Sequence, residues 1–267
     1  MAVLFGAILS QAPCTGQAGE PVEALELEAL AVRYHAEGRQ VEAKELLQRA
    51  QQIWNRQVGS GDPRLTLSRY HLAEVLHALG EEEEAERLLK HVLVMWEEDG
   101  GPYNRKLVAA LVELALVYEA QGRTADIEPI LKRVLAIREW RKAYDPLDYS
   151  DALNALAAYY YATQRHAQAI PLCEQALATD RKVLGNQHSD VATDLGNLAV
   201  LYQYTGRLQD AKTFYRKAIS AWEGSANPLD PALAETLQSY ARLLKQSGDT
   251  LEAQVIDARA RTILSVQ

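Results

Sequence analysis

A glycine that recurs every 42 residues constrains the fold of this chain more than any other feature. It stands at Gly38, Gly80, Gly122, Gly206 and Gly248, and Gln164 fills the one remaining place in the series. Alanine lies seven residues before all six places, and small or apolar residues recur five and twelve residues after them. A period that persists six times indicates a repeat architecture, in which each unit packs mainly on its neighbours.

Each unit is predicted to be two amphipathic helices joined at the glycine. In the fifth unit the apolar positions before Gly206 follow the spacing i, i+3, i+4, i+7, and they are Leu195, Leu198, Ala199 and Tyr202. Glycine suits the interhelical turn because a left-handed backbone costs it no steric penalty. Segments such as "GSGDPR" and "NPLDP" separate the units. Asp190 and Asp230 are predicted to cap the helices that follow.

These positions resemble the tetratricopeptide repeat, whose pattern of apolar, small and aromatic residues matches Leu195, Leu198, Ala199, Tyr202, Ala211, Tyr215 and Ala218. The period exceeds the usual length of about 34 residues and resembles the kinesin light chain type. The segment "LGNQHSDVATDLGNLAVLY" is similar to that subfamily, with Ser189 where the family has proline. The resemblance implies an all-α fold, a right-handed α-solenoid superhelix of about six helix-turn-helix repeats. Residues 19–267 are expected to form a single domain of six 42-residue repeats.

Four residues depart from the repeat pattern. Arg69 stands in an apolar column, Ile127 replaces alanine, Gln164 replaces glycine and Asp257 replaces an aromatic residue or leucine. They predict looser packing in units two to four and a last helix that partly faces solvent.

The resemblance also implies a binding surface, because family members hold an extended peptide or a partner's helix on the inner wall lined by the first helix of each unit. The candidate groove residues are His71, Glu74, His77, Glu113, Asn154, Tyr161, Asn197, Gln203, Tyr204, Gln238 and Arg242. Glu28 is placed on the same wall. Asn154 and Asn197 match the family asparagines that hold the backbone of a bound peptide, since an amide can donate and accept at once.

Composition disfavours other classes of function. A net charge of −8 and a pI near 5.4 do not suit nucleic-acid binding, and no apolar run is long enough to span a membrane. No catalytic motif, cofactor site or metal-ligand spacing is present. A metal cluster of His35, His71 and His77 is less favoured than solvated groove histidines. Trp54, Trp96 and Trp222 share one repeat position and are expected to pack between units rather than to stack on bases.

Residues 1–18 resemble a secretory signal, with an apolar run from Ala2 to Leu9 and small residues before Gly19. No basic residue precedes the apolar run, so a short capping helix is the alternative. The pattern predicts export to the periplasm or the outside of the cell, with a cytoplasmic location as the alternative.

The sequence therefore predicts a non-enzymatic scaffold that binds a protein or peptide segment in its concave groove. The alternative is a self-associating structural or envelope-assembly protein whose repeat ends stack on other copies. The sequence does not identify the partner.

Overall fold

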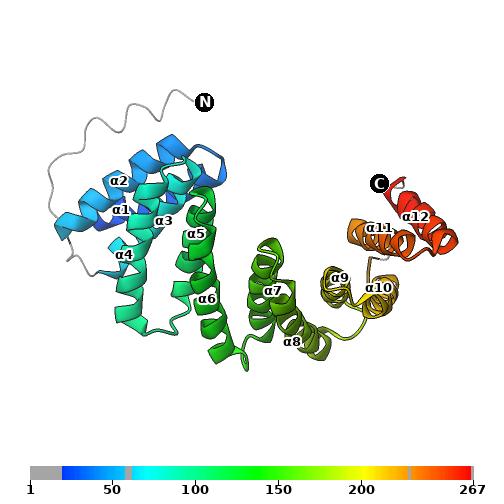
Figure 1. Ribbon diagram of the computed structural model, residues 1–267. Coiled ribbons are helices and arrows are strands. Elements are labelled where there is room, and N and C mark those ends of the chain that lie inside the picture. Colours follow the sequence, from blue (N-terminus) through cyan, green and yellow to red (C-terminus); the bar gives the residue numbers. More distant parts are fainter. Residues whose placement is uncertain (1–19, 58–61, 228–229, 266–267) are drawn as a thin grey trace. The chain divides into compact units, whose positions relative to one another are not determined.

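The computed structural model describes residues 20–57, 62–227 and 230–265. Within these ranges the chain forms twelve α-helices, one short 3-10 helix and no strand (Figure 1). This confirms the predicted all-α fold of consecutive helical pairs. None of the described helices is long and apolar enough to cross a membrane. The signal-like segment, residues 1–18, lies outside the described residues.

The helices fall into two compact units that divide between Arg123 and Thr124. The first unit contains α1 (Glu20–Ala36), α2 (Gln40–Gln57), α3 (Pro63–Ala78), α4 (Glu82–Gly100) and α5 (Lys106–Ala120). The second contains η1 (Thr124–Asp126), α6 (Ile127–Arg141), α7 (Pro146–Ala162), α8 (His166–Leu184), α9 (Ser189–Tyr204), α10 (Leu208–Glu223), α11 (Pro231–Gln246) and α12 (Thr250–Ser265). The single domain over residues 19–267 stays a prediction.

The interhelical turns lie where the 42-residue spacing predicted them. All five glycines of the series have positive φ angles of 71° to 84°, and Gln164 adopts the same left-handed conformation with φ 60°. The residue after each of these six positions donates its N–H to a carbonyl five residues earlier, as Arg207 does to Tyr202 at 2.8 Å. This bond closes the end of the helix and satisfies a carbonyl that the helix leaves free.

Small residues bring the helices of each unit together. Alanine lies five residues after five of the six turn positions, and Ala43, Ala85, Ala169, Ala211 and Ala253 are all fully buried. Trp54, Trp96 and Trp222 are also buried, which agrees with the prediction that they pack between units rather than stack on bases. A small side chain lets two helix axes approach closely, and the large rings fill the space beside them.

Helix capping follows the sequence at one predicted site and departs from it at another. Asp230 caps α11 by accepting from the Ala232 N–H at 2.9 Å, as predicted. The predicted cap at Asp190 is wrong, because α9 begins at Ser189, two residues before the start that a cap at Asp190 requires. His188 is the cap, and its Nδ1 accepts from the Asp190 N–H at 3.2 Å.

The last helix presents polar and exposed side chains, as predicted. Asp257 forms an ion pair with Arg261 and lies 4.0 Å from the Nζ of Lys245. Leu251 and Val255 are exposed on the same helix. Asp257 occupies a column in which the five earlier units carry Leu47, Leu89, Leu131, Cys173 and Tyr215. A charged residue there suits a helix that faces solvent.

Candidate functional site

The second unit contains a hollow between α7 and α9, on the first helices of two successive repeats. It has a volume of about 290 Å³ and is lined by Asn154, Ala157, Ala158, Tyr161, Cys173, Asn197, Val200 and Leu201. Three of these residues, Asn154, Tyr161 and Asn197, are predicted groove residues. The lining combines an apolar floor with two side-chain amides, which suits an uncharged side chain and the peptide backbone that carries it.

Two further hollows continue from the first along α9 and α11. One, of about 280 Å³, is lined by Tyr161, Val200, Gln203, Tyr204, Tyr215, Ser239, Arg242 and Gln246. The other, of about 170 Å³, includes Asn197, Val200, Trp222 and Glu235. Val200 borders all three. We call this continuous surface the α7–α9–α11 groove.

The two groove asparagines have different environments. Asn154 is half-buried, and its Nδ2 donates to Asp194 Oδ1 at 2.8 Å, whereas its own Oδ1 is covered and accepts no hydrogen bond from the described residues. Asn197 is exposed. The two residues are 43 positions apart rather than 42, so they sit about 100° apart around their helices. Asn154 therefore points toward the neighbouring helix, and Asn197 is open to a ligand.

Three aromatic rings form the rim of the groove. His166 stacks on Tyr204 with ring centroids 4.7 Å apart, and Tyr161 meets Tyr204 edge-on at 5.4 Å. Tyr161 is 40% exposed and Tyr204 60%. A hydrogen bond between the two tyrosines, together with burial, raises the pKa of Tyr161. The exposed faces of the Tyr161 and Tyr204 rings can pack against a ligand without breaking contacts inside the protein.

Polar residues of α9 and α11 border the second hollow. The guanidinium of Arg242 donates to the Ser239 hydroxyl at 2.9 Å. The Gln203 amide donates to Gln246 at 3.1 Å and accepts from the Tyr215 hydroxyl at 3.2 Å. Gln238 is half-buried and lines none of the three hollows. The amide of Gln203 is thus held by hydrogen bonds to its neighbours, whereas the guanidinium of Arg242 can donate further hydrogen bonds to a ligand.

The two predicted groove histidines of the first unit each pair with a carboxylate. His71 lies 3.0 Å from Glu74, and His77 lies 2.7 Å from Glu82. Burial raises the pKa of Glu74, but hydrogen bonds from His71 and Tyr70 outweigh it, and the pKa lies below its usual range. Burial raises the pKa of Glu113. No group of three or more His, Cys, Asp or Glu side chains in the described part of the chain has a metal-binding arrangement.

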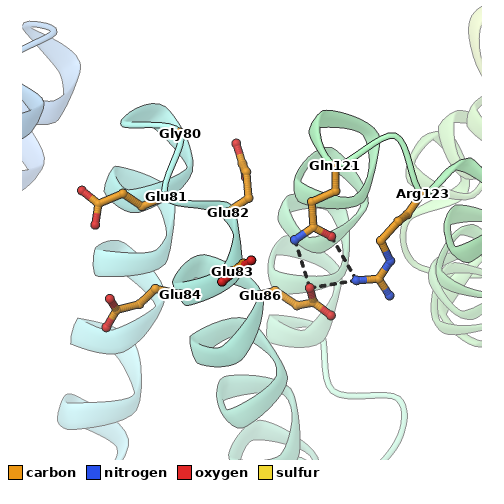
Figure 2. Close-up of a pocket in the computed structure, with 8 residues that line it drawn as sticks. All are labelled: Gly80, Glu81, Glu82, Glu83, Glu84, Glu86, Gln121 and Arg123. Atoms are coloured by element: carbon orange, nitrogen blue, oxygen red, sulfur yellow. Dashed lines mark hydrogen bonds and ion pairs between the residues drawn. The ribbon is translucent and has the colours of Figure 1, made fainter.

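A hollow in the first unit lies away from these residues, at the start of α4. It is lined by Gly80, the run from Glu81 to Glu84, Glu86, Gln121 and Arg123. Figure 2 shows Gln121 and Arg123 reaching toward Glu86, at 3.0 and 2.9 Å. Burial opposes ionisation of Glu86, but hydrogen bonds from Lys90, Gln121 and Arg123 lower its pKa to about 2. Glu86 is therefore occupied by internal partners, and we assign no ligand to this hollow.

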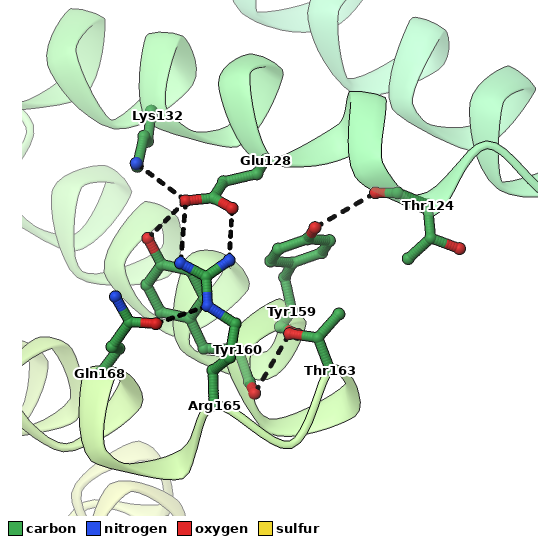
Figure 3. A network of polar contacts seen from close by, with 8 residues as sticks. All are labelled: Thr124, Glu128, Lys132, Tyr159, Tyr160, Thr163, Arg165 and Gln168. Carbon is green, nitrogen blue, oxygen red and sulfur yellow. Dashed lines mark hydrogen bonds and ion pairs between the residues drawn. The ribbon is translucent and has the colours of Figure 1, made fainter.

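A comparable cluster joins α6 to α7 and α8 (Figure 3). Arg165 binds both carboxylate oxygens of Glu128, which also accepts from Lys132 at 2.8 Å and from the Tyr160 hydroxyl at 3.0 Å. These contacts lower the pKa of Glu128 to about 2, with the Arg165 bond as the largest cause. Arg165 also lies over the Tyr160 ring at 4.3 Å. Because its partners all belong to the chain, this cluster fixes the turn rather than binds a ligand.

Comparison with known families decides what kind of repeat this is. The tetratricopeptide repeat family matches the chain over residues 22–93, 64–139 and 148–224. The chain belongs to this family. Comparison with curated proteins finds no match.

Solved structures place this tetratricopeptide repeat protein near the kinesin light chain type. A kinesin light chain protein from Podosopora anserina with nearly identical TPR-like repeats has 27% identity, covering 76% of this chain and 96% of its own, with a TM-score of 0.65. BtubC (BKLC) from P. vanneervenii has 22% identity, covers 91% of both chains and also has a TM-score of 0.65. The apo form of RapI has 12% identity over 93% of this chain and 65% of its own, with a TM-score of 0.72. The latter two show the shared fold alone.

The structure of this tetratricopeptide repeat protein corrects the placement of Glu28. Its side chain is 9% exposed, and Oε1 accepts from the Trp54 indole Nε1 at 2.8 Å. Glu28 therefore belongs to the core. This contact could have been inferred from the tryptophan at position 54, because a buried indole N–H usually finds an acceptor.

Six of the predicted residues line the groove, and other residues beside them were not predicted. Asn154, Tyr161, Asn197, Gln203, Tyr204 and Arg242 line its hollows. His166, Cys173 and Ser239 were missed. His166 begins the second helix of its repeat, and Cys173 lies inside one, so a rule that assigns the groove to first helices overlooks both.

Proposed function

We propose that this protein is a non-enzymatic interaction scaffold whose α7–α9–α11 groove binds an extended polypeptide segment of a partner protein. The observation that carries the proposal is the continuity of the three hollows around Val200, with the open amide of Asn197 beside an apolar floor. Tetratricopeptide repeats commonly serve as protein-interaction scaffolds. An amide that faces the backbone of a bound segment recognises it whatever its side chains are.

Charge favours one direction for the bound segment. Among the described residues Arg242 forms no ion pair, and its only hydrogen bond in this groove is to the neutral Ser239. A carboxylate of the partner would gain a charge-assisted hydrogen bond there. Glu235 lines the hollow shared by α9 and α11, so a basic side chain fits nearer that residue. We therefore expect the bound segment to place an acidic side chain beside Arg242.

The groove can be tested by filling it. Ala158 is exposed and lines the first hollow, so Ala158→Arg should block the hollow without disturbing the core. Ala178, exposed on α8, provides the matched Ala178→Arg control. Peptides would be selected from a random library displayed against the whole protein, and their affinities measured for the three proteins.

We expect Ala158→Arg to weaken binding by at least about tenfold, a loss of about 1.4 kcal/mol, with no change for Ala178→Arg. Asn197→Ala should also weaken binding, whereas Gln209→Ala, an exposed amide on α10, should not. If selected peptides bind Ala158→Arg as tightly as the unmodified protein, the groove assignment is wrong.

The self-association alternative rests on Leu264. It occupies the tryptophan column at the end of the last helix and is 45% exposed. The charged Asp257 lies in the adjacent core column, paired with Arg261, and makes this end unsuited to stacking on another copy. We therefore favour the groove. Sedimentation at micromolar concentration tests the alternative, which predicts dimers or larger species and would be excluded by a monomer at all concentrations.

We also propose that the protein is exported. The apolar run from Ala2 to Leu9, followed by Gly16 and Ala18, supports this proposal. N-terminal sequencing of the protein from its native cell tests it. A mature start near Gly19 is expected, and retention of residues 1–18 in a cytoplasmic fraction would favour the alternative location.

A further inference from the structure

Two buried carboxyl groups lie behind Asn154. Asp180 of α8 is 4% exposed and Asp194 of α9 is 1% exposed. Asp180 stands in the column that holds tryptophan at Trp54, Trp96 and Trp222. Asp180 therefore places a carboxyl group inside this junction at a position where three other units bury a large apolar ring.

The hydrogen bonds of the pair leave two oxygen atoms without a donor. Asp194 Oδ1 accepts from Asn154 Nδ2 at 2.8 Å. Asp194 Oδ2 and Asp180 Oδ1 are covered and receive no hydrogen bond from any described donor. The neighbouring Asp180 carboxyl raises the pKa of Asp194 through hydrogen bonding and charge. A proton on one of the two carboxyl groups supplies a donor to the other, and without it two buried negative charges repel each other.

The charged groups around the pair do not neutralise it. Asp190 of α9 and Asp151 of α7 add negative charge nearby. Cys173 of α8 is a neutral thiol, since burial raises its pKa to about 12. Arg138 of α6 acts on Asp151 and forms an ion pair with Asp148. Arg181 follows Asp180 on α8, and its Nε makes no hydrogen bond with the described residues.

We propose that Asp180 and Asp194 hold one shared proton, and that this proton fixes the side-chain amide of Asn154 against α9 in the groove. Both aspartates are thus positioning residues for the groove amide. When the proton leaves, the repelling carboxylates separate and the hydrogen bond from Asn154 to Asp194 is strained. The groove of the proposed function then loses one ordered wall, so that binding depends on pH. That last consequence rests on the proposed function, whereas the shared proton does not.

The raised pKa of Asp194 agrees with this geometry. Burial is the main cause that raises the pKa of Asp194 to about 7, and the Asp180 carboxyl adds to it. The unfolded chain holds this proton only below the ordinary pKa of 3.8. The stability that the proton provides is therefore fully present below about pH 4. It falls as the pH rises and is lost above about pH 7.

The test uses the full chain and needs no ligand. Thermal unfolding is recorded between pH 5 and 9, and the side-chain amide resonances of Asn154, assigned by their loss in Asn154→Ala, are followed over the same range. Asp194→Asn replaces the shared proton with a permanent N–H donor to Asp180. Asp151→Asn is the matched control, because it removes a nearby carboxylate without touching the pair.

In the unmodified protein and in Asp151→Asn, we expect Tm to fall with rising pH and the Asn154 resonances to titrate near pH 7. In Asp194→Asn both effects should disappear, and Tm at pH 8 should exceed that of the unmodified protein. The proposal is overturned if the Asn154 resonances do not titrate between pH 5 and 9, or if Asp194→Asn titrates as the unmodified protein does.

If Asp194→Asn does not fold, carbon-13 titration of the aspartate carboxyls in the unmodified protein decides the matter. A carboxyl group that titrates near pH 7 supports the shared proton. If no carboxyl group titrates near pH 7, the proposal is overturned. Failure of the groove proposal gives a different result, in which the amide titrates as expected and selected peptides still bind Ala158→Arg.

Discussion

Lys44 donates to both carboxylate oxygens of Glu81, 37 residues later, at 2.8 and 2.5 Å. The equivalent pair one repeat later has the opposite polarity, because Glu86 accepts from Arg123. The remaining junctions carry Glu128–Arg165, the apolar Ile170 opposite Arg207, which cannot form an ion pair with it, and Lys212–Asp249. In some junctions the basic residue comes first in the sequence, and in others the acidic residue does. A residue from one junction would therefore meet a like charge if it were paired with a junction of the opposite order.

Reversal of one charge should therefore destabilise the first unit, and reversal of both should restore it. Lys44→Glu or Glu81→Lys alone places like charges together and should lower the free energy of unfolding by about 1 kcal/mol. The double variant should recover most of this loss. Urea unfolding of the four proteins as a double-mutant cycle measures the coupling. Lys182→Glu, on the exposed surface of α8, is the control, and strictly additive effects of the two reversals would contradict the prediction.

Gln164 provides a second test, because it adopts the left-handed conformation that glycine adopts in the other five turns. Gln164→Gly should raise the free energy of unfolding by about 0.5–1 kcal/mol, since it removes a steric cost that exceeds the entropy glycine adds to the unfolded chain. Gly206→Gln, at φ 77° with open space around the position, should lower it by a similar amount. Denaturant unfolding measures both, and a less stable Gln164→Gly variant would show that the Gln164 side chain stabilises the turn.

The turns were predictable from the sequence because they depend on local backbone geometry. In five of the six units the turn residue with a positive φ is glycine. The sixth turn residue, Gln164, was identified from its place in the 42-residue series. The buried face of each helix was also predictable, because apolar residues recur with the period of the helix.

The partners of individual polar side chains were not predictable, because they depend on which residues of neighbouring helices meet. Glu28 and Asn154 occupy the same repeat column, and each forms a hydrogen bond with a residue of a neighbouring helix. One meets Trp54 of its own unit, and the other meets Asp194, 40 residues later. No spacing in a single sequence distinguishes these two outcomes.

The corrected role of Glu28 gives a third prediction. Glu28→Ala leaves the buried Trp54 indole N–H without an acceptor and should lower the free energy of unfolding by about 1–3 kcal/mol. Glu28→Gln retains an acceptor and should cost less. Glu26→Ala, exposed on the same helix, is the control for loss of charge. Thermal or urea unfolding measures the differences. Equal stability of Glu28→Ala and Glu26→Ala would show that the hydrogen bond to Trp54 does not contribute to the free energy of unfolding.

The last prediction concerns Cys173, which lies on the floor of the first hollow and is 2% exposed. Burial is the main cause that raises its thiol pKa to about 12, from an ordinary value of 9.0. Since the thiolate is the nucleophile, its fraction at pH 8 should be about 1000-fold lower than that of an ordinary thiol. Cys14→Ser leaves Cys173 as the single thiol. Its alkylation by iodoacetamide should be at least about 100-fold slower than that of Ala178→Cys in a Cys14→Ser/Cys173→Ala background. Similar rates would mean that the hollow admits water and the reagent to the sulfur, and that the floor of the groove is more open than the structure shows.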